Sequence, residues 1–386
     1  MNAAPARKLE EMDAKTPADL ARELGPIFAA RTAAADEDQY VAENIKQLKA
    51  SGLVEAGVPA ELGGGGASID ELAAMLRALA HHCGSTALTF SMHTHQVAVP
   101  AWRWAHQPAA KAAVEPLLKR IAGERIMLLS SGGSDWIGGS GKAEKVEGGY
   151  KITARKVFTS GAQTGNLLMT SAVLEEPGQP PMVLHFGIPM NSPHVKVLDT
   201  WRAHGMRGTG SHDVMIDGHV VPEAAVPLKR KAGEWHLLFQ IISTIAFSLV
   251  YGVYLGVAES ARDIAIDMAK KKGPNKYTID LAGRMETELR AAQLGHESML
   301  AAVRRNKPSA EAVNDVMIGR TLVARHAIQA VEYAMELAGG AGFYRAAGLE
   351  RKLRDVQGAR YHPLQIGPQT EFAGAMALGL QVDKIY

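Results

Sequence analysis

The chain has 386 residues, 47% of them apolar, which is enough to form two or three domains with buried cores. Its 42 basic and 40 acidic residues give a net charge of +2, a balance that predicts neither a nucleic-acid partner nor a membrane-surface partner. The single cysteine, Cys83, excludes an intrachain disulfide and a cysteine-based metal cluster. Because the amino-terminal stretch also lacks the apolar core of a signal peptide, we expect a cytoplasmic protein.

Residues 1–125 are expected to form a helical N-terminal domain. Thr16 followed by Pro17 is typical of a helix start, and apolar residues follow at intervals of three and four. Ser68 and Glu71 have the spacing of a capping box and predict the start of another helix. The four consecutive glycines at 63–66 exclude a regular element between these helices.

Two histidines, His93 and His95, stand close together near the end of this helical region. The pair lacks a third ligand at a useful spacing, so we expect no metal site. On a helix the two imidazoles would diverge, and the simplest interpretation is one packed and one exposed histidine. A role for either one in lining a substrate pocket stays open.

Residues 126–232 are expected to form a β-rich middle domain. Residues 130–141 are rich in glycine and serine, whose backbone and hydroxyl groups can take phosphate or carbonyl oxygens. Residues 150–173 then read as two strands joined by the loop at 159–162. Neither a P-loop nor a dinucleotide fingerprint is present, so a surface loop followed by an ordinary hairpin is the plain alternative to a cofactor cradle.

Residues 233–386 are expected to form a helical bundle. Long helical patterns run over 235–272, 278–305 and 310–338, lengths typical of helices that pack side by side. The apolar run at 241–258 contains Ser243, Thr244 and Ser248 as well as two glycines, which favours a buried helix over a membrane span. The predicted fold class is therefore α+β, with helical domains on both sides of a middle domain that forms a barrel or sandwich.

The order of the motifs resembles the acyl-CoA dehydrogenase superfamily along nearly the whole chain. The motifs are Gly133-Ser134-Asp135, Lys156-Val157-Phe158-Thr159-Ser160, Gly205-Met206-Arg207, and the run Gly339-Gly340-Ala341-Gly342-Phe343 with its following Arg354-Asp355. The resemblance implies a flavoprotein with a four-helix bundle at its C-terminal end, FAD as the cofactor with FMN as the alternative, and a homotetramer.

The same resemblance implies roles for particular residues. Phe158 would pack on the flavin ring, and Ser160 would hydrogen-bond near the reactive flavin nitrogen. The cofactor set is completed by Leu129, Ser131 and Ser134, and by Gly339 and Gly340 reaching the flavin of a neighbouring subunit. Ser134 is also assigned to the substrate, together with His93 and His95.

The chain departs from the family where the catalytic base should stand. The two base positions of the superfamily fall near Pro363 and Ala246, neither of which is acidic, and Glu371 is too far along the chain to replace them. Next to the first position stands His362, which can act as base or acid near neutral pH. A branch of two-component monooxygenases in the superfamily has a histidine in this turn and a serine in the position of Ser160. A plain helix-end cap is the other interpretation of His362.

Three functions remain open at this point. The first choice is α,β-dehydrogenation of an acyl-CoA substrate, with an electron-transfer flavoprotein as partner. The alternative is a two-component flavin monooxygenase, in which a flavin reductase supplies reduced flavin, the substrate is aromatic, and His362 and Ser160 are catalytic. The third is a catalytically inactive subunit of a hetero-oligomer, for which the pocket should be blocked.

Overall fold

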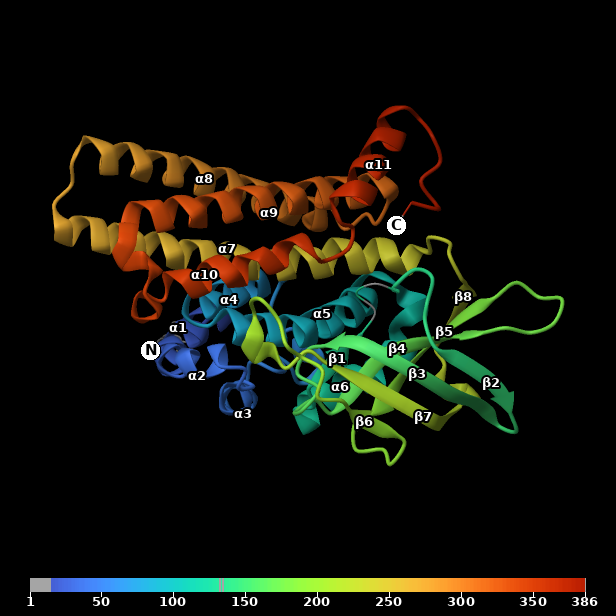
Figure 1. The fold of residues 1–386 in the computed structure, drawn as a ribbon. Helices are drawn as coiled ribbons and strands as arrows, with labels where there is room; N and C mark the ends of the chain where they lie inside the picture. Colours follow the sequence, from blue (N-terminus) through green and yellow to red (C-terminus); the bar gives the residue numbers. More distant parts are fainter. Residues whose placement is uncertain (1–14, 132, 134, 386) are drawn as a thin grey trace, which may run out of the picture.

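The computed structural model describes residues 15–131, 133 and 135–385. Its helices and strands form three parts, shown in Figure 1: an N-terminal group of helices, a single sheet, and a bundle of long helices. Helix α7 (Leu237–Lys272) runs across the molecule, with the N-terminal helices and the sheet on one side of it and the long helices α8 (Lys276–Arg304) and α9 (Ala310–Ala338) on the other. The predicted α+β fold class is confirmed.

The N-terminal helices begin where the capping residues predict. Thr16 and Asp19 form a capping box at the start of one helix, and Ser68 and Glu71 form another, so that both helices satisfy their first free amide groups locally. The helices of this part are α1 (Pro17–Ala30), α2 (Thr32–Asp36), α3 (Ala42–Ala50), α4 (Ile69–His82), α5 (Gly84–His106) and α6 (Lys111–Glu124). Helices α4 and α5 both pack against α7, so the core of the N-terminal helices is continuous with the core of the bundle.

The sheet has eight strands in the order β6-β7-β3-β2-β4-β5-β8, and β1 pairs in parallel with β4 outside this path. Its alternating burial pattern, clearest along β4, gives the sheet one core face. The strands are β1 (Leu128–Ser130), β2 (Lys142–Val146), β3 (Gly149–Thr159), β4 (Leu167–Leu174), β5 (Met182–Pro189), β6 (Val195–Val197), β7 (His212–Pro222) and β8 (Leu228–Lys231).

The bundle consists of α7, α8 (Lys276–Arg304), α9 (Ala310–Ala338), α10 (Leu349–Val356) and α11 (Ile366–Ala377). Among the described residues, α7 is the one helix with the length and apolarity to cross a membrane, but 94% of its most apolar window is buried inside the protein. It is therefore the central helix of the bundle, as the sequence predicts. Short 3-10 helices connect these elements at Ala60–Leu62, Pro108–Ala110, Arg207–Thr209, Glu223–Ala225, Gly339–Phe343, Arg345–Ala347 and Gln357–Arg360.

Candidate active site

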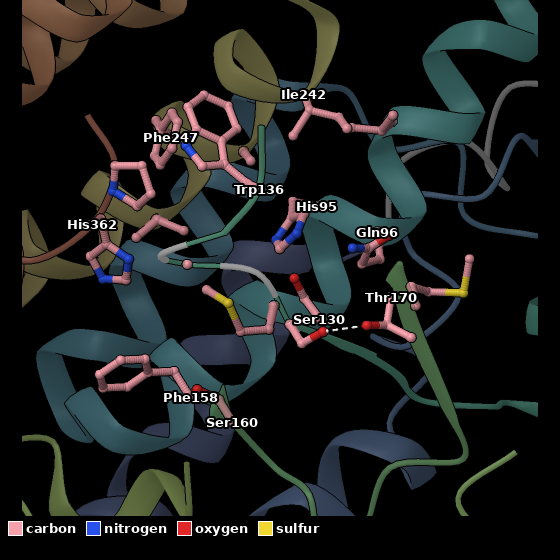
Figure 2. A pocket seen from close by; sticks show the side chains of 18 of the residues that line it. His95, Gln96, Ser130, Trp136, Phe158, Ser160, Thr170, Ile242, Phe247 and His362 are labelled. Atoms are coloured by element: carbon pink, nitrogen blue, oxygen red, sulfur yellow. Dashed lines mark hydrogen bonds between the residues drawn. The ribbon is translucent and has the colours of Figure 1, made fainter. Parts of the chain in front are cut away.

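A cavity of about 1160 Å³ lies where α5, α7, the sheet and the turn after α10 meet. Aromatic and aliphatic side chains supply most of its surface, and histidine, arginine, serine, threonine and glutamine side chains also line it, a mixture that suits an organic small molecule with polar groups. Figure 2 shows His95, Trp136, Phe158, Ser160 and His362 around this space. A cavity of this size argues against a blocked, inactive subunit.

A β-bulge directs Phe158 into the cavity. The pairing of β3 with β7 shifts register between Lys156 and Thr159, and Phe158 within this interval has a left-handed backbone with φ of 54°. Bulges of this kind re-aim side chains next to active sites. Phe158 is 56% exposed as a residue, and its ring meets that of Trp201 edge to face, with 6.2 Å between ring centroids. A flat face is thus presented to the cavity, as the resemblance to the family implies.

Ser160 is the end of a short chain of hydroxyl groups. Its Oγ lies 2.7 Å from Ser211 Oγ, which lies 2.7 Å from Thr209 Oγ1, and all three residues are buried and line the cavity. Because each hydroxyl can donate one hydrogen bond and accept others, the chain can run in either direction. Ser160 can therefore present the cavity with a donor or with an acceptor.

The two histidines of α5 have different surroundings. His93 Nε2 lies 2.9 Å from the Val54 carbonyl oxygen, and its Nδ1 accepts the backbone amide of Leu128 at 3.0 Å. Both ring nitrogens are thus used by the backbone, and His93 lies in the core and not in the cavity lining. The ring has no free nitrogen to offer, so the structure gives no support to the substrate role predicted for His93.

His95 lines the cavity and has one nitrogen available. Its Nδ1 lies 3.0 Å from the Ser91 carbonyl oxygen, which can only accept, so Nδ1 carries the proton. Burial lowers the pKa of His95 to about 4, which keeps the ring neutral near pH 7. Its Nε2 therefore offers the cavity a lone pair, with no hydrogen-bond partner among the described residues.

His362 reaches the cavity from the turn that follows α10. Its Nε2 lies 2.7 Å from the hydroxyl of Tyr254 on α7, and burial, with the positive charge of Arg320, lowers the pKa of His362 to about 3. Arg320 is fully buried and its Nη2 donates to the carbonyl oxygens of Ala359, Arg360 and His362. The turn is thereby held by an arginine, and the imidazole is neutral and fixed by a phenol.

No carboxylate stands among the described residues that line the cavity. Ala246 and Pro363, the two positions where the superfamily's base is expected, both line it and are both apolar. Glu371 is exposed on α11 and takes no part in the lining. The removal of an α proton from an acyl thioester would have to use a histidine, since no acidic side chain is in place for it.

The loop from Ser131 to Gly141 forms one wall of the cavity and is held at several points. Ser131 Oγ lies 2.7 Å from Thr170 Oγ1, and Trp136 meets Trp235, Phe239 and Phe247 edge to face. Buried Lys156 donates to Asp135 and to the Ser140 carbonyl, and Arg230 donates to the carbonyls of Trp136 and Ile137. Ser134, which is predicted to contact cofactor and substrate, lies outside the described residues.

Two further parts of the predicted cofactor set do not line the cavity. The side chain of Leu129 is fully buried in the hydrophobic core of the sheet, packed against Gly165, and its role as a cofactor residue stays a prediction. Gly339 and Gly340 are exposed at the end of α9, away from the cavity of the same chain. Their contact with a neighbouring subunit's flavin stays a prediction.

Several functional groups in the lining were not predicted from the sequence, among them Tyr254, Trp136 and Arg103. Tyr254 is fixed on α7 one helical turn after Tyr251, and this spacing is the one signal that could have pointed to a paired aromatic face. Trp136 follows the Gly-Ser-Asp motif directly, and Arg103 lies in the last turn of α5. Single residues of these types carry no motif, so only the folded contacts reveal them.

Comparisons with known proteins identify the family of the chain. The acyl-CoA dehydrogenase N-terminal domain model matches residues 8–120, and the acyl-CoA dehydrogenase C-terminal domain model matches residues 249–365. The amino sugar nitrososynthase DnmZ of Streptomyces peucetius is 27% identical over 95% of both chains. A pigment production hydroxylase of a Rhodococcus strain is 26% identical over 94% of this chain and 96% of its own.

A solved structure has the same fold throughout. KijD3, in complex with FMN and dTDP-3-amino-2,3,6-trideoxy-4-keto-3-methyl-D-glucose, superposes with a TM-score of 0.86 at 25% identity, covering 96% of this chain and 98% of its own. Family models, relatives and fold thus confirm the resemblance that the motifs indicate, and the chain belongs to the acyl-CoA dehydrogenase superfamily.

Proposed function

We propose that this protein is the oxygenase component of a two-component flavin-dependent monooxygenase, supplied with reduced flavin by a separate flavin reductase. The observation that carries the proposal is that no carboxylate stands among the described lining residues, while two neutral histidines, His95 and His362, line the same cavity as the positions where the superfamily's base is expected. Acyl-CoA dehydrogenation, the first choice from sequence, is less well supported because the carboxylate base that the superfamily uses for it is absent from the described lining residues.

The residues present fit a flavin. Phe158 offers a flat apolar face, and Ser160 offers a hydroxyl that can donate or accept. An oxidised flavin has a nitrogen that accepts a hydrogen bond where the reduced flavin has an N–H that donates one, and the reversible hydroxyl chain suits both. When bound and reduced, the flavin supplies the electrons that activate molecular oxygen.

The side chains of this protein would position the substrate, exclude water and hold protons. Trp136, Phe239 and Phe247 form an apolar wall that keeps water from the reacting atoms. His95 Nε2 can accept a proton from the substrate, and His362 with Tyr254 can hold a hydrogen bond to the substrate. The roles of His362 and Ser160 as catalytic residues are part of this proposal.

The relatives support oxygen chemistry and a compact organic substrate. A nitrososynthase and a pigment hydroxylase are each similar over nearly the whole chain, and the neighbouring KijD3 structure contains FMN. FMN is therefore the cofactor to test first, with FAD as the second. We also propose a homotetramer, supported by exposed apolar side chains on the bundle helices at Leu294, Ile318 and Leu322.

The proposal is tested by two reactions of the same purified protein. Under anaerobic conditions the FMN- or FAD-loaded protein is mixed with acyl-CoA thioesters of different length, and we expect no bleaching of the flavin band. With a flavin reductase, NADH and oxygen, we expect oxygen uptake coupled to oxygenation of an added substrate. Bleaching by any acyl-CoA would show a dehydrogenase and overturn the proposal.

A further inference from the structure

One end of the cavity is lined by hydrogen-bond donors that come from three different elements. Arg103 lies in the last turn of α5, His185 lies on β5, and His236 is the N-cap residue of α7; all three line the cavity. We call these residues the donor cluster. It lies beside two apolar residues, because His185 pairs with Leu228 across β5 and β8 and His236 directly precedes Leu237 at the start of α7.

The proton positions of the two histidines follow from their partners. Arg230 Nε donates to His185 Nε2 at 3.0 Å, so the proton of a neutral His185 must be on Nδ1. The backbone amide of Leu238 donates to His236 Nδ1 at 3.1 Å, so the proton of His236 must be on Nε2. Each imidazole accepts from the protein and is left with an N–H to donate.

Arg103 adds a positive charge that no carboxylate neutralises. Its Nε donates to Gln107 Oε1 at 3.1 Å, and it forms no ion pair with any described residue. Burial lowers the pKa of Arg103, and burial followed by the charges of Arg230 and Arg103 lowers the pKa of His236. The groups therefore lie close enough to repel each other electrostatically.

The carboxylates nearest in the chain do not complete the cluster. Glu115 on α6 pairs with Lys119 at 2.7 Å, and Glu234 lies 4.0 Å from Lys231. Neither of these carboxylates lines the cavity. A cluster that can only donate, and that carries net positive charge, is suited to bind a group that can only accept and is negative.

We propose that the donor cluster binds the anionic group, a carboxylate or a phosphate, of an organic substrate whose apolar body lies along the cavity beside Trp136 and Phe247. The substrate of the proposed oxygenation is thus an amphipathic acid, and this inference rests on the proposed function. The phosphate group of a bound flavin is the other anion that the donor cluster could bind. The experiment distinguishes binding of the substrate's anionic group from binding of the flavin phosphate.

Binding is measured calorimetrically on the full chain, without reductase or turnover, so that failure of this inference and failure of the proposed oxygenation are distinct results. The probes are acid and amide pairs of one shape: phenylacetate, indole-3-acetate and naphthalene-2-acetate, each with its neutral amide. We expect at least one acid to bind tenfold or more tightly than its amide. The substitution Arg103→Gln should remove this preference, and Arg103→Lys should keep part of it.

The matched control is Arg120→Gln on neighbouring α6, where an exposed arginine pairs with Glu124 outside the cavity lining. It should leave the preference for the acid unchanged. FMN and riboflavin, which differ by the phosphate, are compared in the same variants, and Arg103→Gln should not change the ratio of their affinities. Equal binding of every acid and its amide would overturn the inference, as would a loss of FMN affinity but not riboflavin affinity in Arg103→Gln.

Discussion

His93 and His95 are two residues apart on α5, yet replacing each with leucine should have opposite consequences. In His93→Leu the Val54 carbonyl and the Leu128 amide lose their partners in a buried site, at about 1–3 kcal/mol each, and the stacking on Phe90 is lost as well. We expect the free energy of unfolding to fall by about 4 kcal/mol. Because His93 does not line the cavity, the chemistry of the folded fraction should be unchanged.

In His95→Leu the Ser91 carbonyl keeps its ordinary bond within the helix, so the loss of stability should be below about 1 kcal/mol. The cavity, however, loses the lone pair of His95 Nε2. We expect the reaction of the protein with reduced FMN and oxygen to slow by about a hundredfold, the lower end of the range for a group that transfers protons.

Urea unfolding followed by circular dichroism gives the stability of each variant, and rapid mixing of the folded protein with reduced FMN and oxygen gives the reaction. The two variants are matched in side chain, helix and position, so each is the control of the other. Equal losses of stability, or an unchanged oxygen reaction in His95→Leu, would refute the assignment of one core and one cavity histidine.

Two further substitutions and a change of pH should affect stability and flavin chemistry to different extents. Tyr254→Phe removes the hydroxyl held by His362, and should cost about 1 kcal/mol of stability and slow the oxygen reaction while FMN affinity, measured by titration, stays the same. Phe158→Gly should weaken FMN binding about tenfold, yet leave the unfolding midpoint nearly unchanged, because glycine adopts the left-handed backbone freely and the exposed ring buries little surface. Stability should fall as pH falls from about 6.5 towards 4, by roughly 1.4 kcal/mol per pH unit for each buried neutral histidine, because each folded pKa is lowered and the unfolded chain binds the extra protons. These histidines, with pKa lowered to about 4 or about 3, are His93, His95, His185 and His362. A pH titration of urea midpoints that is flat over this range, or a Phe158→Gly variant that binds FMN normally, would contradict these expectations.

The order and type of the elements could be predicted because the signals for them are local. The capping boxes at Thr16 and Ser68 fix two helix starts, and the periodic run that ends before Gly339 predicts α9. Family motifs give the order of the three parts. These signals depend only on residues that are close in the sequence, so they can be recognised without knowing the fold.

The sequence could not predict that His93 lies in the core and His95 lines the cavity, because these positions depend on contacts between distant segments. His93 is held by Val54 and Leu128, which lie 39 and 35 positions away, and His362 is held by Tyr254, which lies 108 positions away. Two residues that are two positions apart on a helix point in different directions, and only the packing decides which one meets the core. For the same reason Leu129 is predicted to contact the cofactor although its side chain packs into the sheet.

The most direct test of the monooxygenase proposal is the reaction of the protein with reduced FMN and oxygen, followed by absorbance in a rapid-mixing instrument. We predict a protein-dependent band, different from those of reduced and oxidised FMN, that decays more slowly than free reduced FMN reoxidises and decays faster in His362→Ala. Reoxidation at the rate of free flavin, with no distinct band in the wild-type protein, would contradict the proposal that this cavity controls oxygen chemistry.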